Sequence, residues 1–207
     1  MRLTKKLWKN NFDLALMSLE TKFIKGIRTG ELPRKIFQDY VAQDSYFLKS
    51  FSKAYELAIS KSPNTKCSIV LSKLLKGVKD ELVLHETYAK NWNINLKTNY
   101  LQDSTKKYTD FLEHSALNQS CIDILCAMTP CMRLYAWLGK KLEKDFVDNP
   151  YKEWIMTYAH KDFENLAQSL ENLIDANDEL LDIDNANYLY KEAMILELEF
   201  FQTYSIF

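Results

Sequence analysis

Glycine and proline are the residues that most often interrupt regular structure, and this chain has only four of each in 207 residues. Scarce breakers favour a few long helices over a β-sandwich or a nucleotide-binding βαβ fold, which both need many turns. Apolar residues recur at helical spacing, and neither strand-like alternation nor an internal repeat is evident. The sequence therefore predicts an all-α fold, with residues 1–207 forming a single compact helical bundle.

Caps and breakers divide this pattern into six or seven helices. Gly30 suits the C-terminal cap of a first helix, and Pro33 suits the first turn of a second. Residues 93–103 are polar and residues 175–184 are acidic, so we expect a loop and then a linker or short turn there. The expected helices span residues 3–28, 33–61, 65–92, 104–114, 119–144, 150–173 and 185–204.

Charge and cysteine content limit the classes of partner and compartment. A net charge of −1 gives no reason to expect a nucleic-acid or membrane partner. No apolar run approaches the ~18 residues of a membrane span, and no apolar core follows the basic N-terminal residues as in a secretory signal. The four cysteines form no CxxC pair, which suits a reducing compartment, so we expect a cytoplasmic protein.

A proline lies inside the fifth predicted helix. Its ring crowds the carbonyl of Cys126, so the helix either kinks at Pro130 or stops and restarts there. In the second case Cys131 lies near a helix N-terminus, where free N–H groups and the helix dipole lower the pKa of a thiol. Tyr135, one turn later, then faces the same pocket. The alternative is that Cys131 is buried and inert.

Two acidic positions on the helical pattern are ambiguous. Asp44 shares a face with Phe47 and Leu48, and by pattern alone it points to solvent at the edge of this apolar stripe. Glu81 and His85 are separated by four residues on one helix. Such a pair can be half of a carboxylate-bridged metal site, but we expect a hydrogen-bonded structural pair.

Six short groups of residues follow one another in a recognisable order. They are residues 30–33 with Phe37, Tyr40, Gln43 and Asp44; residues 54–58; residues 108–109; residues 127–135; Tyr151 with Trp154, Ile155 and Tyr158; and residues 196–201. Together they resemble the TenA family of thiamin-salvage enzymes (thiaminase II, aminopyrimidine aminohydrolase), and most closely its plant-type, cysteine-containing branch. The resemblance covers nearly the whole chain and implies the family's haem-oxygenase-like bundle.

The resemblance also implies a reaction. Water replaces an amine, or the thiazolium of thiamin, on the 5-methylene carbon of a 4-amino-2-methylpyrimidine, without a metal or cofactor. Cys131 is then the nucleophile that adds to the ring, and Glu197, with its pKa raised by burial, is the acid that protonates a ring nitrogen. Asp44 accepts a hydrogen bond from the 4-amino group. The other substrate-binding residues are Phe47, Tyr108, Tyr135 and Tyr158.

The chain departs from the family pattern at two places. Many relatives have tyrosine where this chain has Phe47, and many have a His-Pro before Phe23, where this chain has Thr21 and Lys22. The first change removes a hydroxyl from the expected site. Plant-type relatives are often fused to a phosphatase domain, and we expect this chain to hold only the TenA-like part.

Two other functions and an oligomer complete the expectations. A dimetal oxidase on the same bundle requires Glu81, His85 and His160 to converge with Asp162 or Glu164. A catalytically silent binding or regulatory protein needs only the pocket. Twelve tyrosines and eleven phenylalanines exceed the needs of one pocket, which together with the resemblance favours a homodimer or homotetramer.

Overall fold

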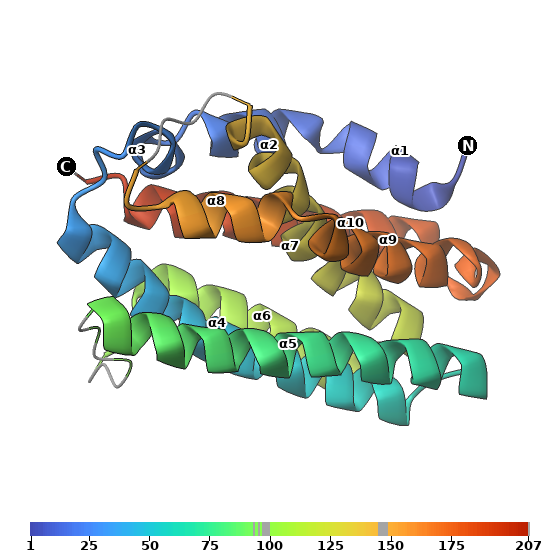
Figure 1. Cartoon of the computed structure of the whole chain (residues 1–207). Coiled ribbons are helices and arrows are strands. Elements are labelled where there is room, and N and C mark those ends of the chain that lie inside the picture. Colours follow the sequence, from blue (N-terminus) through green and yellow to red (C-terminus); the bar gives the residue numbers. More distant parts are fainter. Residues whose placement is uncertain (93, 95, 97–99, 145–148, 207) are drawn as a thin grey trace.

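The structure, a computed structural model, describes residues 1–92, 94, 96, 100–144 and 149–206. Within these ranges the regular structure is entirely helical, which confirms the predicted all-α class (Figure 1). The helices are α1 (Leu3–Asn10), α2 (Phe12–Leu19), α3 (Lys22–Thr29), α4 (Arg34–Ser60), α5 (Thr65–Trp92), α6 (Asp103–Asn118), α7 (Cys121–Leu142), α8 (Lys152–Ala159), α9 (Lys161–Asp175), the 3₁₀-helix η1 (Asp178–Leu180) and α10 (Ile183–Thr203).

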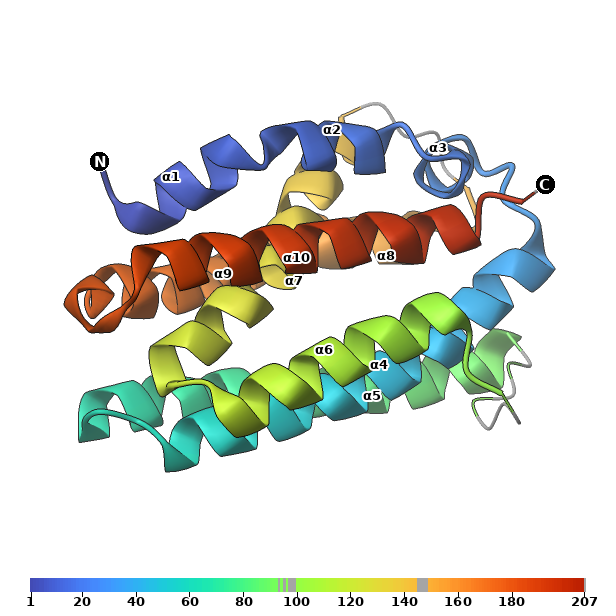
Figure 2. The ribbon, with the colours of Figure 1, turned by 180° about the vertical axis from the view of Figure 1, so that it is seen from behind.

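Helix α7 crosses the middle of the bundle. Figures 1 and 2 show α4, α5 and α6 in one layer and α8, α9 and α10 in another, with α7 running between them. Helix α7 contacts helices of both layers, while α1 and α2 lie against the outer side of α9 and α10. By length and composition alone α7 could cross a membrane, but 83% of its most apolar stretch is buried inside the bundle, as in a core helix.

The predicted first helix, residues 3–28, is divided into three. Asn11 separates α1 from α2, and its buried side-chain amide donates to the carbonyl of Leu7 at 2.9 Å. Thr21 then caps α3, accepting from the N–H of Ile24 at 3.3 Å. The apolar spacing continues across both interruptions, so the pattern did not reveal them. Gly30 ends α3 with a φ of 80°, as its predicted capping role requires.

The predicted helix over residues 150–173 is likewise two helices. His160 has extended backbone angles and ends α8, and its ring Nδ1 accepts from the N–H of Asp162 at 3.2 Å. This side-chain cap starts α9 as a separate helix. The predicted acidic linker contains η1, and α6 continues four residues beyond its expected end at His114.

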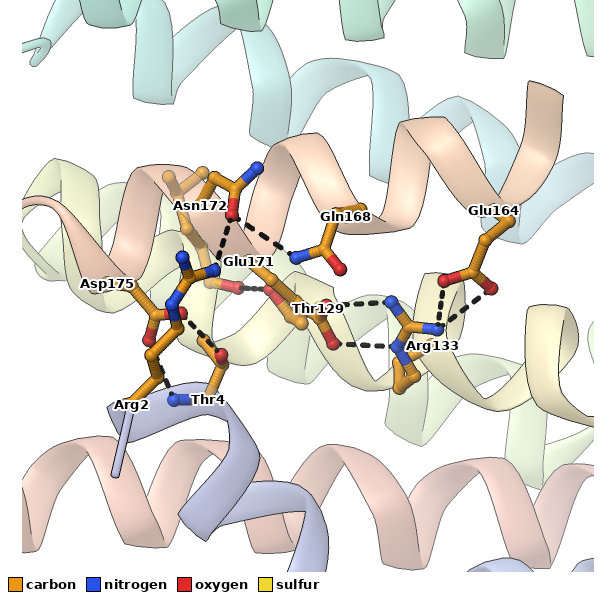
Figure 3. A network of polar contacts seen from close by, with 10 residues as sticks. Arg2, Thr4, Thr129, Arg133, Glu164, Gln168, Glu171, Asn172 and Asp175 are labelled. Atoms are coloured by element: carbon orange, nitrogen blue, oxygen red, sulfur yellow. Dashed lines mark hydrogen bonds and ion pairs between the residues drawn. The ribbon is translucent and has the colours of Figure 1, made fainter. Parts of the chain in front are cut away.

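An arginine joins α7 to α9 (Figure 3). The Nε and Nη2 atoms of Arg133 donate to the two carboxylate oxygens of Glu171, both at 2.7 Å, and Nη1 donates to Glu164 at 2.8 Å. A bidentate pair of this kind fixes orientation as well as distance. These contacts therefore fix α9 against α7.

Candidate active site

Five helices surround a small cavity at the centre of the molecule. Its volume is about 20 Å³, little more than a water molecule occupies. Helix α4 contributes an i, i+3, i+4, i+7 face to it, and α7 contributes an i, i+4 pair. The lining residues are Asp44, Phe47, Leu48 and Phe51 of α4; Val78 and Glu81 of α5; Cys131, Met132 and Tyr135 of α7; Tyr158 of α8; and Phe163 of α9.

Cys131 lies inside a continuous helix. Helix α7 runs from Cys121 through Pro130 to Leu142, so the restart that would have placed Cys131 at a helix N-terminus is wrong. The lowering of the thiol pKa that such a restart would bring is therefore wrong as well. Burial raises the pKa of Cys131 well above its usual value, and the nearby carboxyls of Glu197, Asp44 and Glu81 raise it further. These effects favour the protonated thiol form of Cys131.

Asp44 is buried, with 4% of its surface exposed, so the solvated position expected from its pattern is wrong. A helix pattern shows only the neighbours on one helix, whereas the carboxyls that act on Asp44 come from α5 and α10. Burial raises the pKa of Asp44, and the charges of Glu81 and Glu197 raise it further. A carboxyl in this setting holds a proton more readily than one in water.

Glu197 lies deeper than the cavity wall, 1% exposed. Burial raises its pKa to about 7, although hydrogen bonds from the Tyr108 hydroxyl, at 2.8 Å, and from the Cys131 thiol lower it. Tyr108 also lies behind the wall, with its ring 4.6 Å from that of Phe47. These two residues thus reach the cavity through Cys131 and Phe47, whereas the other predicted site residues line it directly.

Sequence reasoning missed Glu81 as part of this site. The Tyr158 hydroxyl donates to the Glu81 carboxyl at 3.0 Å, and burial raises the pKa of Glu81 to about 7. The expected structural partner, His85, lies outside the described side chains. The available signal was the carboxylate itself, placed one turn after the buried Val78 on an otherwise apolar face.

Aromatic rings form the remaining wall. The ring of Tyr135 lies 4.7 Å from that of Tyr158 in an edge-to-face arrangement. The hydroxyls of Tyr135 and Tyr40 are 3.2 Å apart, and the indole N–H of Trp154 donates to Tyr40 at 3.3 Å. These bonds hold flat apolar surfaces and polar tips in fixed positions, which suits a planar heterocycle with nitrogen atoms at its edge.

The residues proposed for a dimetal site do not converge where they are described. Glu81 faces Tyr158, Glu164 binds Arg133, and His160 lies at the surface beside Asp162. No group of three or more potential metal ligands occurs among the described residues. The geometry of the site is that of a thiol among protonatable carboxyls, which suits nucleophilic and acid–base chemistry.

Comparison with known proteins identifies the family of this chain. Residues 16–204 match the TENA/THI-4/PQQC family. The chain belongs to this family. It is 33% identical to the mitochondrial bifunctional TH2 protein of Arabidopsis thaliana over 222 aligned residues, which cover 95% of this chain and 36% of that protein. The chain thus spans about a third of that relative's length.

Shorter relatives match over most of their length. Aminopyrimidine aminohydrolases from Halalkalibacterium halodurans and Bacillus subtilis are each 31% identical, over 74% and 76% of this chain and 71% and 68% of theirs. A TenA homologue from Pyrococcus furiosus has the same fold, with a TM-score of 0.92 at 20% identity over 98% of this chain and 99% of its own. Haem oxygenase-1 of Synechocystis, 15% identical, has a TM-score of 0.64 over 98% and 92%. The TenA resemblance and the haem-oxygenase-like bundle are confirmed.

Proposed function

We propose that the protein is a thiamin-salvage hydrolase. It acts on 4-amino-2-methylpyrimidines that carry a leaving group on the 5-methylene carbon, and gives 4-amino-5-hydroxymethyl-2-methylpyrimidine. The observation that carries this proposal is the meeting of one thiol with three carboxyls of raised pKa beneath aromatic walls. Relatives named aminopyrimidine aminohydrolase support the same reaction class.

Residues of the cavity wall bind the pyrimidine ring. Asp44 accepts a hydrogen bond from the 4-amino group, and the rings of Phe47 and Tyr135 cover the faces of the pyrimidine. The cavity of about 20 Å³ is smaller than the ring, so binding moves wall side chains outward. Met132 is suited to this motion because its unbranched side chain rearranges at low cost.

The first step forms a bond between Sγ of Cys131 and a ring carbon. Because the resting group is a thiol, its proton passes to the Glu197 carboxylate as the sulfur attacks. The displaced ring electrons move onto a ring nitrogen, which takes that proton from Glu197. One carboxyl with a pKa of about 7 thus serves as base and then as acid.

The following steps restore the enzyme. The electron pair returns from the ring nitrogen and the methylene–leaving-group bond breaks, so that an ammonium substituent departs as a neutral amine and a thiazolium departs as a neutral thiazole. Water adds to the exposed methylene, giving one proton to Glu81, whose partner Tyr158 orients it. The carbon–sulfur bond then breaks as the ring nitrogen returns its proton to the sulfur through Glu197, and Glu81 releases the water proton to the departed amine or to solvent. For an aminomethyl substrate the balance is pyrimidine amine plus water to pyrimidine alcohol plus ammonia.

Replacing the thiol tests this function. Cys131→Ser keeps the size of the side chain but removes the nucleophile, so we expect turnover of 4-amino-5-aminomethyl-2-methylpyrimidine and of thiamin to fall at least ~1,000-fold. Pyrimidine binding, measured by calorimetry, should stay within about threefold. Product identity is followed by chromatography and mass spectrometry.

The matched control is Cys121→Ser at the start of α7. Cys121 lies beside Ser62 and Cys67, where a hydroxyl finds polar neighbours, so this variant should keep its turnover. Near-normal activity of Cys131→Ser would disprove the covalent mechanism. Binding without turnover by the unaltered protein would favour the silent binding protein instead.

We also propose a cytoplasmic homodimer or homotetramer. Apolar side chains that remain exposed on the bundle surface, including Leu16 and Met17 of α2 and Tyr188 of α10, support association between subunits. The Arabidopsis relative is named mitochondrial, so the compartment is a prediction. Sedimentation measurements on the purified protein decide the oligomeric state.

A further inference from the structure

A second, larger hollow opens beside the catalytic cavity. It has a volume of about 280 Å³ and lies between α5 and the α8–α9 corner, with Met132 of α7 at its base. Four residues line both spaces: Val78, Glu81, Met132 and Phe163. We call the larger hollow the outer groove. It adjoins the catalytic cavity at these four side chains.

The walls of this outer groove are apolar and its rim is acidic. Leu74 and Leu166 face it from α5 and α9, while Asp80, Glu81 and Asp162 supply carboxyls. His160 also lines it, with Nδ1 3.3 Å from the Asp162 carboxylate. None of the described residues that line it is lysine or arginine. A flat or ring-shaped cation matches both properties, since its body can contact the apolar wall while its charge faces the carboxyls.

Gly77 sets the width of the outer groove. It lies on α5 opposite Leu166 of α9, and a Cβ atom built on Gly77 would lie 3.5 Å from Leu166 Cδ1, an ordinary contact distance. A single added methyl therefore fits without a clash and narrows the groove slightly, while a longer side chain at this position occupies more of it. Glycine in the middle of a long helix lowers the stability of that helix. In return, its missing side chain leaves the space of the groove open.

We propose that the outer groove is the leaving-group subsite, and that it admits a ring-sized cation such as the thiazolium of thiamin. This inference rests on the proposed pyrimidine chemistry at Cys131. With the pyrimidine in the catalytic cavity, the substituent on its 5-methylene carbon leaves through the wall formed by Met132 and Phe163. The carboxyls of Glu81 and Asp80 then face the positive charge of the group before it departs.

The test measures binding in the Cys131→Ser protein, so that turnover does not interfere. Dissociation constants for 4-amino-5-aminomethyl-2-methylpyrimidine and for thiamin are determined by calorimetry with and without Gly77→Leu. The leucine occupies part of the outer groove, so thiamin affinity should fall at least about tenfold more than the affinity for the small amine. Gly77→Ala should shift the same ratio in the same direction by about twofold to threefold.

The control is Ser72→Leu, which adds an uncharged leucine to an exposed position of the same helix outside the outer groove. It should leave the ratio of the two dissociation constants unchanged. If Gly77→Leu unfolds the protein, the Gly77→Ala ratio decides, because the added methyl makes only an ordinary contact.

The outcomes separate the two proposals. If neither ligand binds, the proposed function fails. If the aminomethyl compound binds but thiamin does not, or if the ratio is the same in the Gly77 variants and in Ser72→Leu, the leaving-group subsite is wrong and the pyrimidine chemistry stands. A ratio that moves only in the Gly77 variants supports the subsite.

Discussion

At the scale of single residues, the catalytic proposal depends on where one proton resides. The Cys131 thiol and the Glu197 carboxyl are neighbours whose pKa values are both raised by burial. A thiol that holds its proton is a weak nucleophile, so the ionised fraction of Glu197 sets how often attack can begin. With a pKa of about 7, Glu197 is near half-ionised at neutral pH, which suits a group that must both take and give a proton.

The Tyr108 hydroxyl provides a way to change this pKa alone. Its hydrogen bond to Glu197 lowers the pKa of that carboxyl, so Tyr108→Phe should raise it and reduce the carboxylate present at pH 7. We expect the acidic limb of kcat/KM against pH to move to higher pH by about one unit, the size of one hydrogen bond to a charged group.

Tyr55→Phe is the matched control for this profile. It removes the same atom from a buried tyrosine of α4 whose hydroxyl has no hydrogen-bond partner among the described residues. Its acidic limb should stay in place. If the acidic limb is also unmoved in Tyr108→Phe, Glu197 is not the base that accepts the thiol proton.

At the scale of helices, α7 and α8 approach each other closely at Gly139. A Cβ atom on Gly139 would lie 2.4 Å from the backbone nitrogen of Ala159 and 2.4 Å from the carbonyl carbon of Tyr158. Such distances are impossible for real atoms, so any side chain at this position separates the two helices. Glycine at 139 is thus what allows Tyr158 to pack against Tyr135.

Gly139→Ala should therefore damage both stability and catalysis. We expect the free energy of unfolding to fall by roughly 2–3 kcal/mol, since overpacking outweighs the better helix propensity of alanine. Turnover should fall as well, because Tyr158 moves with α8. Urea denaturation and steady-state kinetics measure the two effects.

Gly77→Ala is the control for Gly139→Ala, because it is the same substitution in another helix, where the added methyl makes only ordinary contacts. It should be as stable as the unaltered protein or more so. Equal stability of the two alanine variants would show that α7 and α8 are not in close contact at Gly139.

Helix content and the site residues could be predicted from the sequence to different extents. Apolar spacing locates the helices because it reflects burial, but the breaks at Asn11 and His160 depend on single side-chain bonds to the backbone, which spacing does not encode. Asp44 and Glu81 show why pattern alone fails at a site. Each is an isolated carboxylate on its own helix, and only the packing of α4, α5, α7 and α10 brings them together.

At the scale of the whole molecule, a cluster of protonated acids makes stability depend on pH. The pKa values of Glu81 and Glu197 are raised by burial to about 7, and that of Asp44 is also raised. Between the ordinary carboxyl pKa, near 4.5, and pH 7, the folded protein holds protons that the unfolded chain has lost. Folding stability must then decrease as pH rises through this range, because the folded state binds more protons than the unfolded state.

We therefore expect the free energy of unfolding to be larger at pH 5 than at pH 8, by on the order of 3 kcal/mol for one buried carboxyl with a pKa near 7. Urea denaturation at both pH values measures the difference. Glu197→Gln is neutral at every pH, so its loss of stability between pH 5 and pH 8 should be smaller than that of the unaltered protein. Equal stability at the two pH values would mean that folding does not raise the pKa of these carboxyls. Glu197 would then be too weak a base to take the proton of a thiol whose own pKa is raised, and the proton transfer proposed for it fails.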